Sequence, residues 1–555
     1  MIKALKKRHK ALLPAEEKVI DEPTLPCAPG TTELKGEFTD GQSSEEKNKK
    51  SPLERFFLSR AYALILCLLV MVGHLTALEF YFNIPFVILS AISLFTVKSI
   101  KPFIPTMLTF VYQITIEHVP GFPTWSNYYA EPERIVVLGV VVVILLTAIL
   151  FYFFKNTLRC IKPSSSPLFY PLVLLSVAFM TNGLLSENWI LSDLIFGFAE
   201  SLVFFVLFYM IYYGIKEEDT KELLDYMSFL SLLISIILIS QIAKVYLHYN
   251  DLIDRWGRVI KHKINVGWGG PNPLAFAIVI QLPFLIRGAI KLKRWGVYAF
   301  VTVLNLFAIF LTFSRNAFLF AAITTAILFL SACFFGKRKK FFTNLINCAG
   351  VFAFMFLFVF IEKLEPLLAG LKLVGLGDSG RNNIWNKAIE QFNESPLFGS
   401  GFFGLHVDEL RDVAAFLPDM AHNTFLQLLM AMGIFGFFAY FVYRIHSFKP
   451  FITKPSFEKL ILFFVIFITL GTSMLDNFIF YFHTAFPYII SLAIAFKMMD
   501  EENKVKAEKR MTKKEAKIAK RALKKSIASS TPVADTAEDE YQEASIELES
   551  STVLN

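Results

Sequence analysis

The sequence predicts an all-α, polytopic integral membrane protein with about fourteen transmembrane helices. Of its 555 residues, 55% are hydrophobic and only 18% are charged, whereas soluble domains carry about 25% charged residues. The charges are also unevenly distributed, because residues 61–498 hold 57 of them, mostly in short clusters between long apolar runs. Runs of about 20 apolar residues are long enough, as helices, to cross a hydrocarbon core. A soluble enzyme is therefore excluded.

Fourteen apolar runs mark the expected spans, and three short runs leave counts of twelve or thirteen open. The runs cover about 61–80, 83–97, 103–117, 135–154, 168–185, 192–214, 226–246, 272–287, 295–312, 316–335, 342–361, 422–443, 459–475 and 477–497. Basic residues gather in every second connection, for example at Lys98, Lys155, Arg287 and Lys337. Because lysine and arginine favour the cytoplasmic side, we expect a multi-pass protein with both termini in the cytoplasm.

Charged segments flank the transmembrane domain, 61–498. Residues 1–60 have mixed charge with proline and serine, which predicts a disordered cytoplasmic arm. Residues 499–555 form a cytoplasmic charged tail, in which 501–530 carry 11 basic and 4 acidic side chains and 531–555 carry 7 acidic and no basic ones. The basic part has a helix-prone composition. It is either a solvated tail or a peripheral helix on anionic membrane lipid.

Known cofactor motifs do not occur in the sequence. The five cysteines lack the spacing of metal ligands, and three lie in or beside apolar runs. No phosphate-binding Walker loop, dinucleotide fingerprint, zinc-protease motif or calcium loop is present. We therefore expect a protein without a metal or another cofactor and without a nucleic-acid partner.

The connection 247–271 is predicted to lie outside the cytoplasm but is basic, against the usual bias. Arg258 and Lys263 belong to this cluster, which would suit an anionic ligand such as a diphosphate at the outer leaflet. Alternatively, the arginines only pair with Asp251 and Asp254. The glycine- and proline-rich stretch 267–273 then breaks the chain before the next span and exposes backbone N–H groups that can hold an oxyanion.

The longest loop, 362–421, is also predicted to be extracytoplasmic, and its aromatic residues and helical period favour a folded loop. Arg381 and Trp385 stand four residues apart, so they share one helix face. This pair could hold a phosphate with the guanidinium and stack a sugar on the indole. The alternative is that Trp385 is an ordinary packing anchor of the loop.

Two further polar sites lie at membrane boundaries. His422 and Asn423 close the long loop at the mouth of a span, and histidine is well suited to accept a proton near neutral pH. Arg315 occupies a very short connection between two spans, where a charge is costly unless it has a partner. It either extends to the interface or neutralises an anionic ligand there.

Four ordered motifs between about 270 and 436 resemble the O-antigen ligase and polymerase family of bacterial envelope glycan enzymes. They are Gly-Pro-Asn-Pro-Leu-Ala (270–275), Leu-Thr-Phe-Ser-Arg-Asn (311–316), the set Arg381, Trp385 and Pro-Leu-Phe-Gly-Ser-Gly (396–401), and His-Asn-Thr-Phe-Leu-Gln (422–427) followed by Gly-Ile-Phe-Gly (433–436). Each motif alone is weak, but their order and predicted side are those of the family.

The resemblance implies a metal-independent glycosyltransferase of surface polysaccharide biosynthesis in the bacterial plasma membrane. Such an enzyme takes a glycan from undecaprenyl diphosphate and passes it to a hydroxyl of a glycan, lipid or protein acceptor. It implies that His422 is the general base, that Arg315 holds the diphosphate, and that Asn423 contributes to the substrate site. The family commonly has an arginine before the Pro-Asn element, where this chain has Lys263 and, further back, Arg258. The alternative function is a transporter or flippase of lipid-linked or anionic cargo.

Overall fold

The computed structural model describes residues 51–76, 78–114, 132–187, 189–215, 220–249, 263–335, 381–403, 421–474 and 477–529. Every regular element in these ranges is a helix, which confirms the all-α fold class. Eight helices are long and apolar enough to cross a membrane, and shorter apolar helices accompany them. The expected span at 342–361 lies outside the described residues, so the expected range of twelve to fourteen spans stays a prediction.

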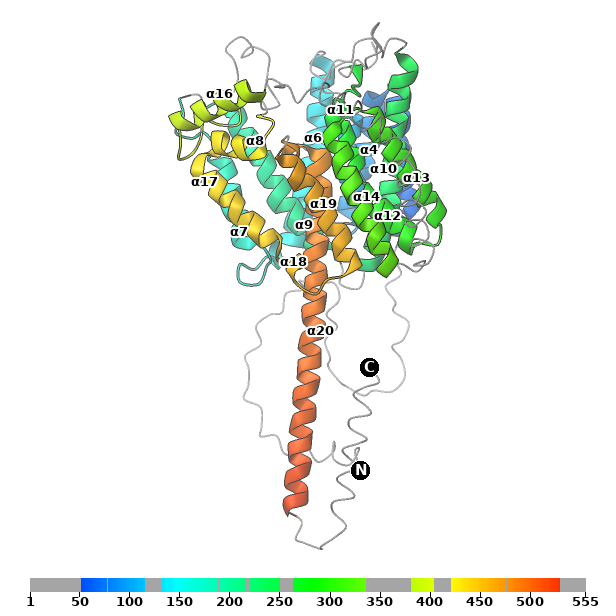
Figure 1. Ribbon diagram of the computed structural model, residues 1–555, viewed down its shortest axis with the longest axis vertical. Helices are drawn as coiled ribbons and strands as arrows, with labels where there is room; N and C mark the ends of the chain where they lie inside the picture. The colour runs from blue at the N-terminus through cyan, green and yellow to red at the C-terminus, as the bar shows by residue number, and fades with distance from the viewer. Residues whose placement is uncertain are drawn as a thin grey trace, which may run out of the picture.

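The helices stand side by side in a block, with its two ends marked by different elements (Figure 1). The last helix, α20 (Phe482–Ser529), projects far beyond one end of the block, which we call the α20 end. The short helix α16 (Arg381–Glu394) and the start of α11 (Pro271–Val279) lie at the opposite end, which we call the α16 end.

Apolar side chains on the outside of the block identify a surface that faces lipid. On α13 (Trp295–Leu311), Phe300, Val303, Phe307 and Phe310 are each more than half exposed. They are spaced three or four residues apart and so lie on one helix face. A stripe of this kind in water would be an aggregation hazard. The structure therefore supports a polytopic membrane protein.

Of the first helices, α3 (Arg60–Thr76) packs against α10 (Thr220–His248) and against α4 (Glu79–Thr96). Helix α4 in turn packs against α6 (Pro132–Tyr152). The run predicted as a span at 103–117 differs: its described part is divided into η1 (Lys101–Phe103), α5 (Ile104–Thr109) and η2 (Phe110–Gln113). The three elements follow one another over 101–113 and together extend about 20 Å at 1.5 Å per residue. This is shorter than a hydrocarbon core of about 30 Å, so the described part does not form one membrane-crossing helix.

The helices between residues 169 and 335 include one group at the edge of the block and one group at its centre. The peripheral group contains α7 (Phe169–Met180) and the continuous run of α8 (Leu191–Ser201), the π-helix η5 (Leu202–Leu207) and α9 (Phe208–Gly214). In the central group, α11 and α12 (Leu282–Lys291) are almost entirely buried. They are followed by α13 and α14 (Arg315–Phe335). Because α12 and α13 form a hairpin at the α20 end, the turn between α13 and α14 lies at the α16 end (Figure 1).

Helix α17 (Thr424–Ser447) is broken at Gly433, whose φ of 63° and ψ of −162° are not helical. The segment 396–401 fills the break with backbone hydrogen bonds. The amides of Ser400 and Gly401 donate to the carbonyls of Met430 and Ala431 at 2.7 and 3.1 Å. In return, the carbonyls of Pro396 and Leu397 accept from the amides of Ile434 and Phe435 at 2.8 and 3.2 Å. The segment 396–401 thus pairs four backbone groups of α17 beside the break, and unpaired backbone groups are costly in lipid.

The last helices complete the block. After α17 come α18 (Lys449–Ile452), α19 (Phe457–Ser473), the short η9 (Phe478–Phe480) and α20. Arg444 of α17 is buried, with its guanidinium 4.5 Å from the ring centre of Tyr440 and 4.8 Å from that of Tyr488 on α20. Desolvated cation–π contacts stabilise by about 2 kcal/mol, so this arginine holds the second half of α17 against α20.

Substituting Gly433 with alanine should destabilise the protein by about 2–4 kcal/mol, from backbone strain and overpacking. The new Cβ would lie 2.4 Å from the carbonyl oxygen of Leu397, at a positive φ. Thermal unfolding of the purified protein in detergent measures the change. The control is Gly139→Ala on α6, where a Cβ meets no atom within 4 Å. Equal melting temperatures for both variants would mean that the break in α17 is not constrained by the segment 396–401.

Candidate functional site

The entrance to α11 is anchored by Trp268, which is buried. Its indole N–H donates to Oε1 of Gln241 on α10 at 3.0 Å, and its ring lies 4.8 Å from that of Tyr112 and 5.3 Å from that of His483. Gly267 makes the tight turn before it with a φ of 86°. The glycine-rich stretch is therefore a fixed element, which ends where Gly270 caps α11.

Of the two basic residues expected to bind an anion before this stretch, Lys263 is among the described residues. Lys263 lies with its ammonium 5.6 Å from the ring centre of Tyr249, at the end of α10. Arg258 lies outside the described residues. The ammonium of Lys263 is thus held near the entrance to α11, on the connection where the sequence predicted an anion site.

Arg315 is the first residue of α14 and is exposed. The turn before it is tight, since Phe313 has a φ of 54°, and the buried side chain of Thr312 accepts from the amide of Ser314 at 3.3 Å. The hydroxyl of Tyr246 on α10 donates to the carbonyl of Leu311 at 2.6 Å. These contacts fix the backbone from which the guanidinium of Arg315 extends at the α16 end.

His422 has a strained backbone held from both sides. Its φ is 50°, a region that non-glycine residues rarely adopt. On one side, Asn423 caps α17, because its side-chain oxygen accepts from the amides of Phe425 and Leu426 at 2.9 and 3.3 Å. On the other side, both backbone groups of Ala421 are bonded to side chains. Strain of this kind persists only where the surroundings determine it, and it gathers at functional sites.

The two side chains that bond to Ala421 come from different elements. The indole N–H of Trp385 on α16 donates to the Ala421 carbonyl at 2.9 Å. The Ala421 amide donates to Oε1 of Gln427 at 2.7 Å. The same oxygen accepts from Nδ2 of Asn477 at 2.9 Å, and all of these groups except the half-buried Trp385 are buried. Trp385 is thus joined to Ala421 by a hydrogen bond, and its two expected roles, sugar stacking and packing of the loop, stay predictions. Arg381 is the first residue of α16.

Asp193 was not identified from the sequence. It is fully buried at the start of α8, where Oδ1 accepts from the amide of Phe403 and Oδ2 from the amide of Ile190, each at 3.0 Å. It holds the end of the segment 396–401 against α8, and Gly401 leaves no space for a Cβ beside it. The sequence signal that could have identified Asp193 is its place as an acidic residue at the third position of an apolar helix. Asn477 had no comparable signal.

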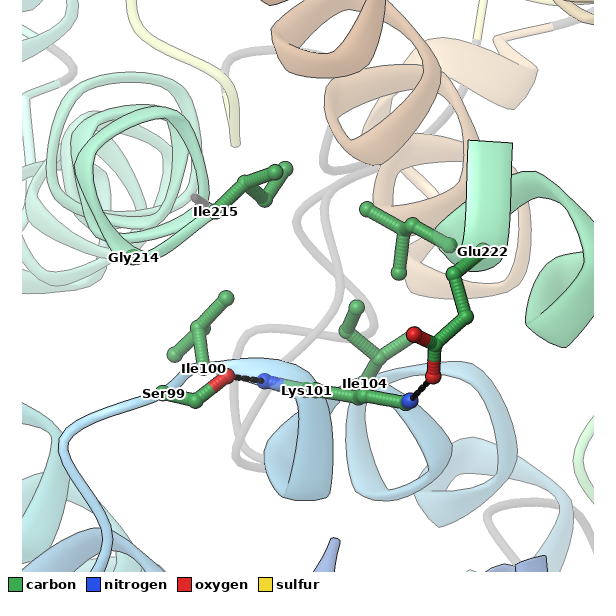
Figure 2. Close-up of a pocket in the computed structure, with 8 residues that line it drawn as sticks. Ser99, Ile100, Lys101, Ile104, Gly214, Ile215 and Glu222 are labelled. Carbon is green, nitrogen blue, oxygen red and sulfur yellow. Dashed lines mark hydrogen bonds and ion pairs between the residues drawn. The ribbon is translucent and has the colours of Figure 1, made fainter. Parts of the chain in front are cut away.

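Those expected site residues that the structure describes fall on one end of the block. The start of α11, the turn before α14, α16 and the start of α17 all lie at the α16 end (Figure 1). A cavity of about 30 Å³ lies elsewhere, next to the ion pair of Lys101 and Glu222 and the end of α9 at Gly214 (Figure 2). Thr220 nearby bonds to Glu501, where α20 leaves the block, so this cavity belongs to the α20 end. It has room for only one or two water molecules.

Within the described ranges, no group of three or more His, Cys, Asp or Glu side chains stands close enough to hold a metal ion. The expected groups that the structure describes at the α16 end include the guanidinium of Arg315, the ammonium of Lys263, the imidazole of His422 and the amide of Asn423. This set suits an anionic substrate and a proton transfer.

The fold is that of a polytopic helical membrane protein, and the described candidate residues lie at one end of it. Residues 300–441 match the family model described as O-antigen ligase, so the chain contains an O-antigen ligase domain and is an enzyme of the glycosyltransferase type. This finding confirms the resemblance. The match includes Arg315, Arg381, Trp385, His422 and Asn423 but not Lys263. No curated protein matches the chain.

Replacing Trp385 with phenylalanine should loosen the backbone at 421–423 while keeping most of the packing. The Ala421 carbonyl loses its donor, which costs about 1–3 kcal/mol if that group stays buried. Hydrogen exchange followed by mass spectrometry should show faster exchange in the peptide that spans the start of α17. Asn382→Ala, at an exposed position of the same helix, is the control. Unchanged exchange in both variants would contradict a holding role for the indole N–H.

Proposed function

We propose that this protein transfers a glycan from undecaprenyl diphosphate to an acceptor hydroxyl on the extracytoplasmic face of the bacterial plasma membrane. The O-antigen ligase domain supports this, because the family acts on lipid-linked glycans generally. The acceptor in this proposal is a hydroxyl of a glycan, a lipid or a protein.

The observation that carries the proposal is the held conformation of His422. His422, with its φ of 50°, stands between two fixed neighbours. Asn423 caps α17, and the two backbone groups of Ala421 are bonded by the side chains of Trp385 and Gln427. A general base must be kept within hydrogen-bond distance of the proton that it removes. A fixed backbone serves this need better than a mobile loop, so the imidazole of His422 is the base in our proposal.

The reaction is a direct displacement. The imidazole of His422 accepts the proton of the acceptor hydroxyl, and the oxygen attacks the anomeric carbon of the glycan. The new glycosidic bond forms as the bond to the lipid diphosphate breaks, and the diphosphate leaves with the electron pair. Inversion at the anomeric carbon follows. A guanidinium placed at the departing oxygens stabilises their charge in the transition state, and we assign this role to Arg315.

The remaining expected residues have supporting roles. Lys263 and Arg258 would add positive charge for the diphosphate near the entrance to α11, although an ammonium lacks the two-point grip of a guanidinium. Arg381 would contact phosphate or sugar from the start of α16. The indole N–H of Trp385 and the side-chain oxygen of Asn423 are engaged by the backbone. We therefore propose that these two residues position His422.

The proposal also assigns the sides of the membrane. The α16 end would be extracytoplasmic, and both termini would lie in the cytoplasm with the projecting part of α20 (Figure 1). The predicted cytoplasmic connections are rich in lysine and arginine, which supports this orientation.

Substituting His422 with alanine should lower glycan transfer by about 10²–10⁴-fold, the usual contribution of a general base. Binding of the donor should be retained, because the imidazole acts on the acceptor. Both are measured on purified protein with an undecaprenyl-diphosphate glycan, and Lys387→Ala on the exposed face of α16 is the control. Equal transfer by the variant and the wild type would remove His422 from the mechanism. Donor binding without transfer by the wild type would favour a transporter.

Substituting Arg315 with lysine should be nearly as damaging as substitution with alanine. Lysine keeps the charge but cannot bind two phosphate oxygens with a planar fork. We expect each variant to lose about 100-fold or more in transfer rate, as for other groups that stabilise a developing oxyanion. Initial rates at saturating donor separate this loss from weaker binding. A fully active lysine variant would rule out the phosphate-holding role.

A further inference from the structure

Helix α20 is held firmly where it leaves the block. Three consecutive acidic residues contact three different elements there. The hydroxyl of Tyr212 on α9 donates to Asp500, the hydroxyl of Thr220 on α10 donates to Glu501 at 3.1 Å, and Nζ of Lys459 on α19 lies 2.9 Å from Glu502. Lys459 is itself buried. Contacts on several sides fix the direction of the helix beyond this point.

Beyond these contacts the helix continues without interruption from Asn503 to Ser529. At 1.5 Å per residue, 27 residues extend about 40 Å, and Figure 1 shows this part projecting from the block. The side chains of residues 503–515 are all exposed. An isolated helix in water draws little stability from packing, so this segment depends on its own side chains or on a partner.

The charges of the projecting helix oppose its stability. Residues 503–529 contain 11 basic and 2 acidic side chains. Basic residues four positions apart repel each other. Six such pairs occur among the described side chains: Lys506 with Arg510, Lys509 with Lys513, Arg510 with Lys514, Lys513 with Lys517, Lys517 with Arg521, and Arg521 with Lys525. An anionic partner would remove this repulsion.

The basic residues also gather on one side of the helix. At 100° per residue, all of them except Lys504 fall within an arc of about 160°. This basic face consists of Lys506, Lys509, Arg510, Lys513, Lys514, Lys517, Lys520, Arg521, Lys524 and Lys525, while Glu508 and Glu515 lie on the opposite side. The exposed apolar residues Val505, Met511 and Ile518 do not form a continuous apolar seam, because the charged residues Lys514 and Glu515 lie between the last two, where a heptad repeat needs an apolar side chain. Charge, and not an apolar stripe, would therefore select the partner.

The direction of the helix argues against the membrane surface as this partner. A residue 20 positions beyond the acidic contacts stands about 30 Å further along the axis. Electrostatic attraction is screened over about 8 Å at physiological salt. Most of the basic face is thus beyond the reach of anionic lipid at the end of the block.

We propose that the acidic C-terminal segment 531–555 of the same chain docks along the basic face of α20. This segment follows the helix directly and carries 7 acidic and no basic side chains. Its 25 residues can extend about 80 Å, twice the length of the projecting helix. Tethering at the far end of that helix gives the segment a high local concentration. Docking would shield the basic face from other anionic molecules.

Zero-length carbodiimide cross-linking of the full chain tests this directly. The protein is placed in nanodiscs of neutral phosphatidylcholine, and the cross-linked peptides are read by mass spectrometry. We expect amide links within one chain from lysines of the basic face to the acidic group Asp535, Glu538, Asp539, Glu540, Glu543, Glu547 and Glu549. The links should disappear in 1 M salt, where screening acts over about 3 Å.

Two variants complete the test. Changing the seven C-terminal carboxylates to amides should speed hydrogen exchange in residues 503–529, because the repulsion is no longer offset. Glu508→Gln with Glu515→Gln, on the opposite side of the helix, should leave the cross-links in place. Cross-links only between isotope-labelled and unlabelled copies would overturn docking within one chain. Hydrogen exchange in residues 503–529 that changes with anionic lipid but not with the amide substitutions would also overturn the proposal. The absence of both the cross-links and the change in exchange would overturn it as well.

Discussion

The broken helix α17 can exist at membrane depth only because a second stretch of backbone supplies the hydrogen bonds that the helix loses at Gly433. In lipid, no water replaces them. The segment 396–401 therefore must lie where it does, within reach of Met430, Ala431, Ile434 and Phe435. This requirement fixes the end of α16, and α16 in turn carries the indole that bonds to Ala421 beside His422.

A second constraint joins the two parts of the site. Oε1 of Gln427 accepts from both Ala421 and Asn477, and Asn477 directly precedes η9. The ring of Phe478 in η9 lies 4.5 Å from that of Phe276 on α11, and the ring of His483 lies 5.3 Å from that of Trp268, tilted by 58°. The start of α17 and the entrance to α11 are thus tied through the turn between α19 and α20. Buried polar networks of this kind are costly to disturb, because each member is needed to satisfy another.

Ion pairs join different helices at the α20 end of the block, as in Lys101 with Glu222, Arg287 with Asp225 and Lys291 with Glu458. Such pairs hold helices in register. At the α16 end, Arg315 follows a tight turn, and the ammonium of Lys263 lies over the ring of Tyr249.

The sequence by itself determined the fold class, most helix positions and the family, because long apolar runs must become helices in lipid and because the motifs at 270–275, 311–316 and 422–427 are local. It also identified His422 and Arg315 as candidates from their places at span boundaries. Only the tertiary structure decided that Trp385 bonds to Ala421, that Asn423 caps a helix, and that Asp193 and Asn477 support the site. These contacts join residues far apart in the chain, and no local pattern encodes which donor meets which acceptor. The division of 101–113 into short helices has the same origin, since burial among neighbouring helices removes the need to cross the membrane as one helix.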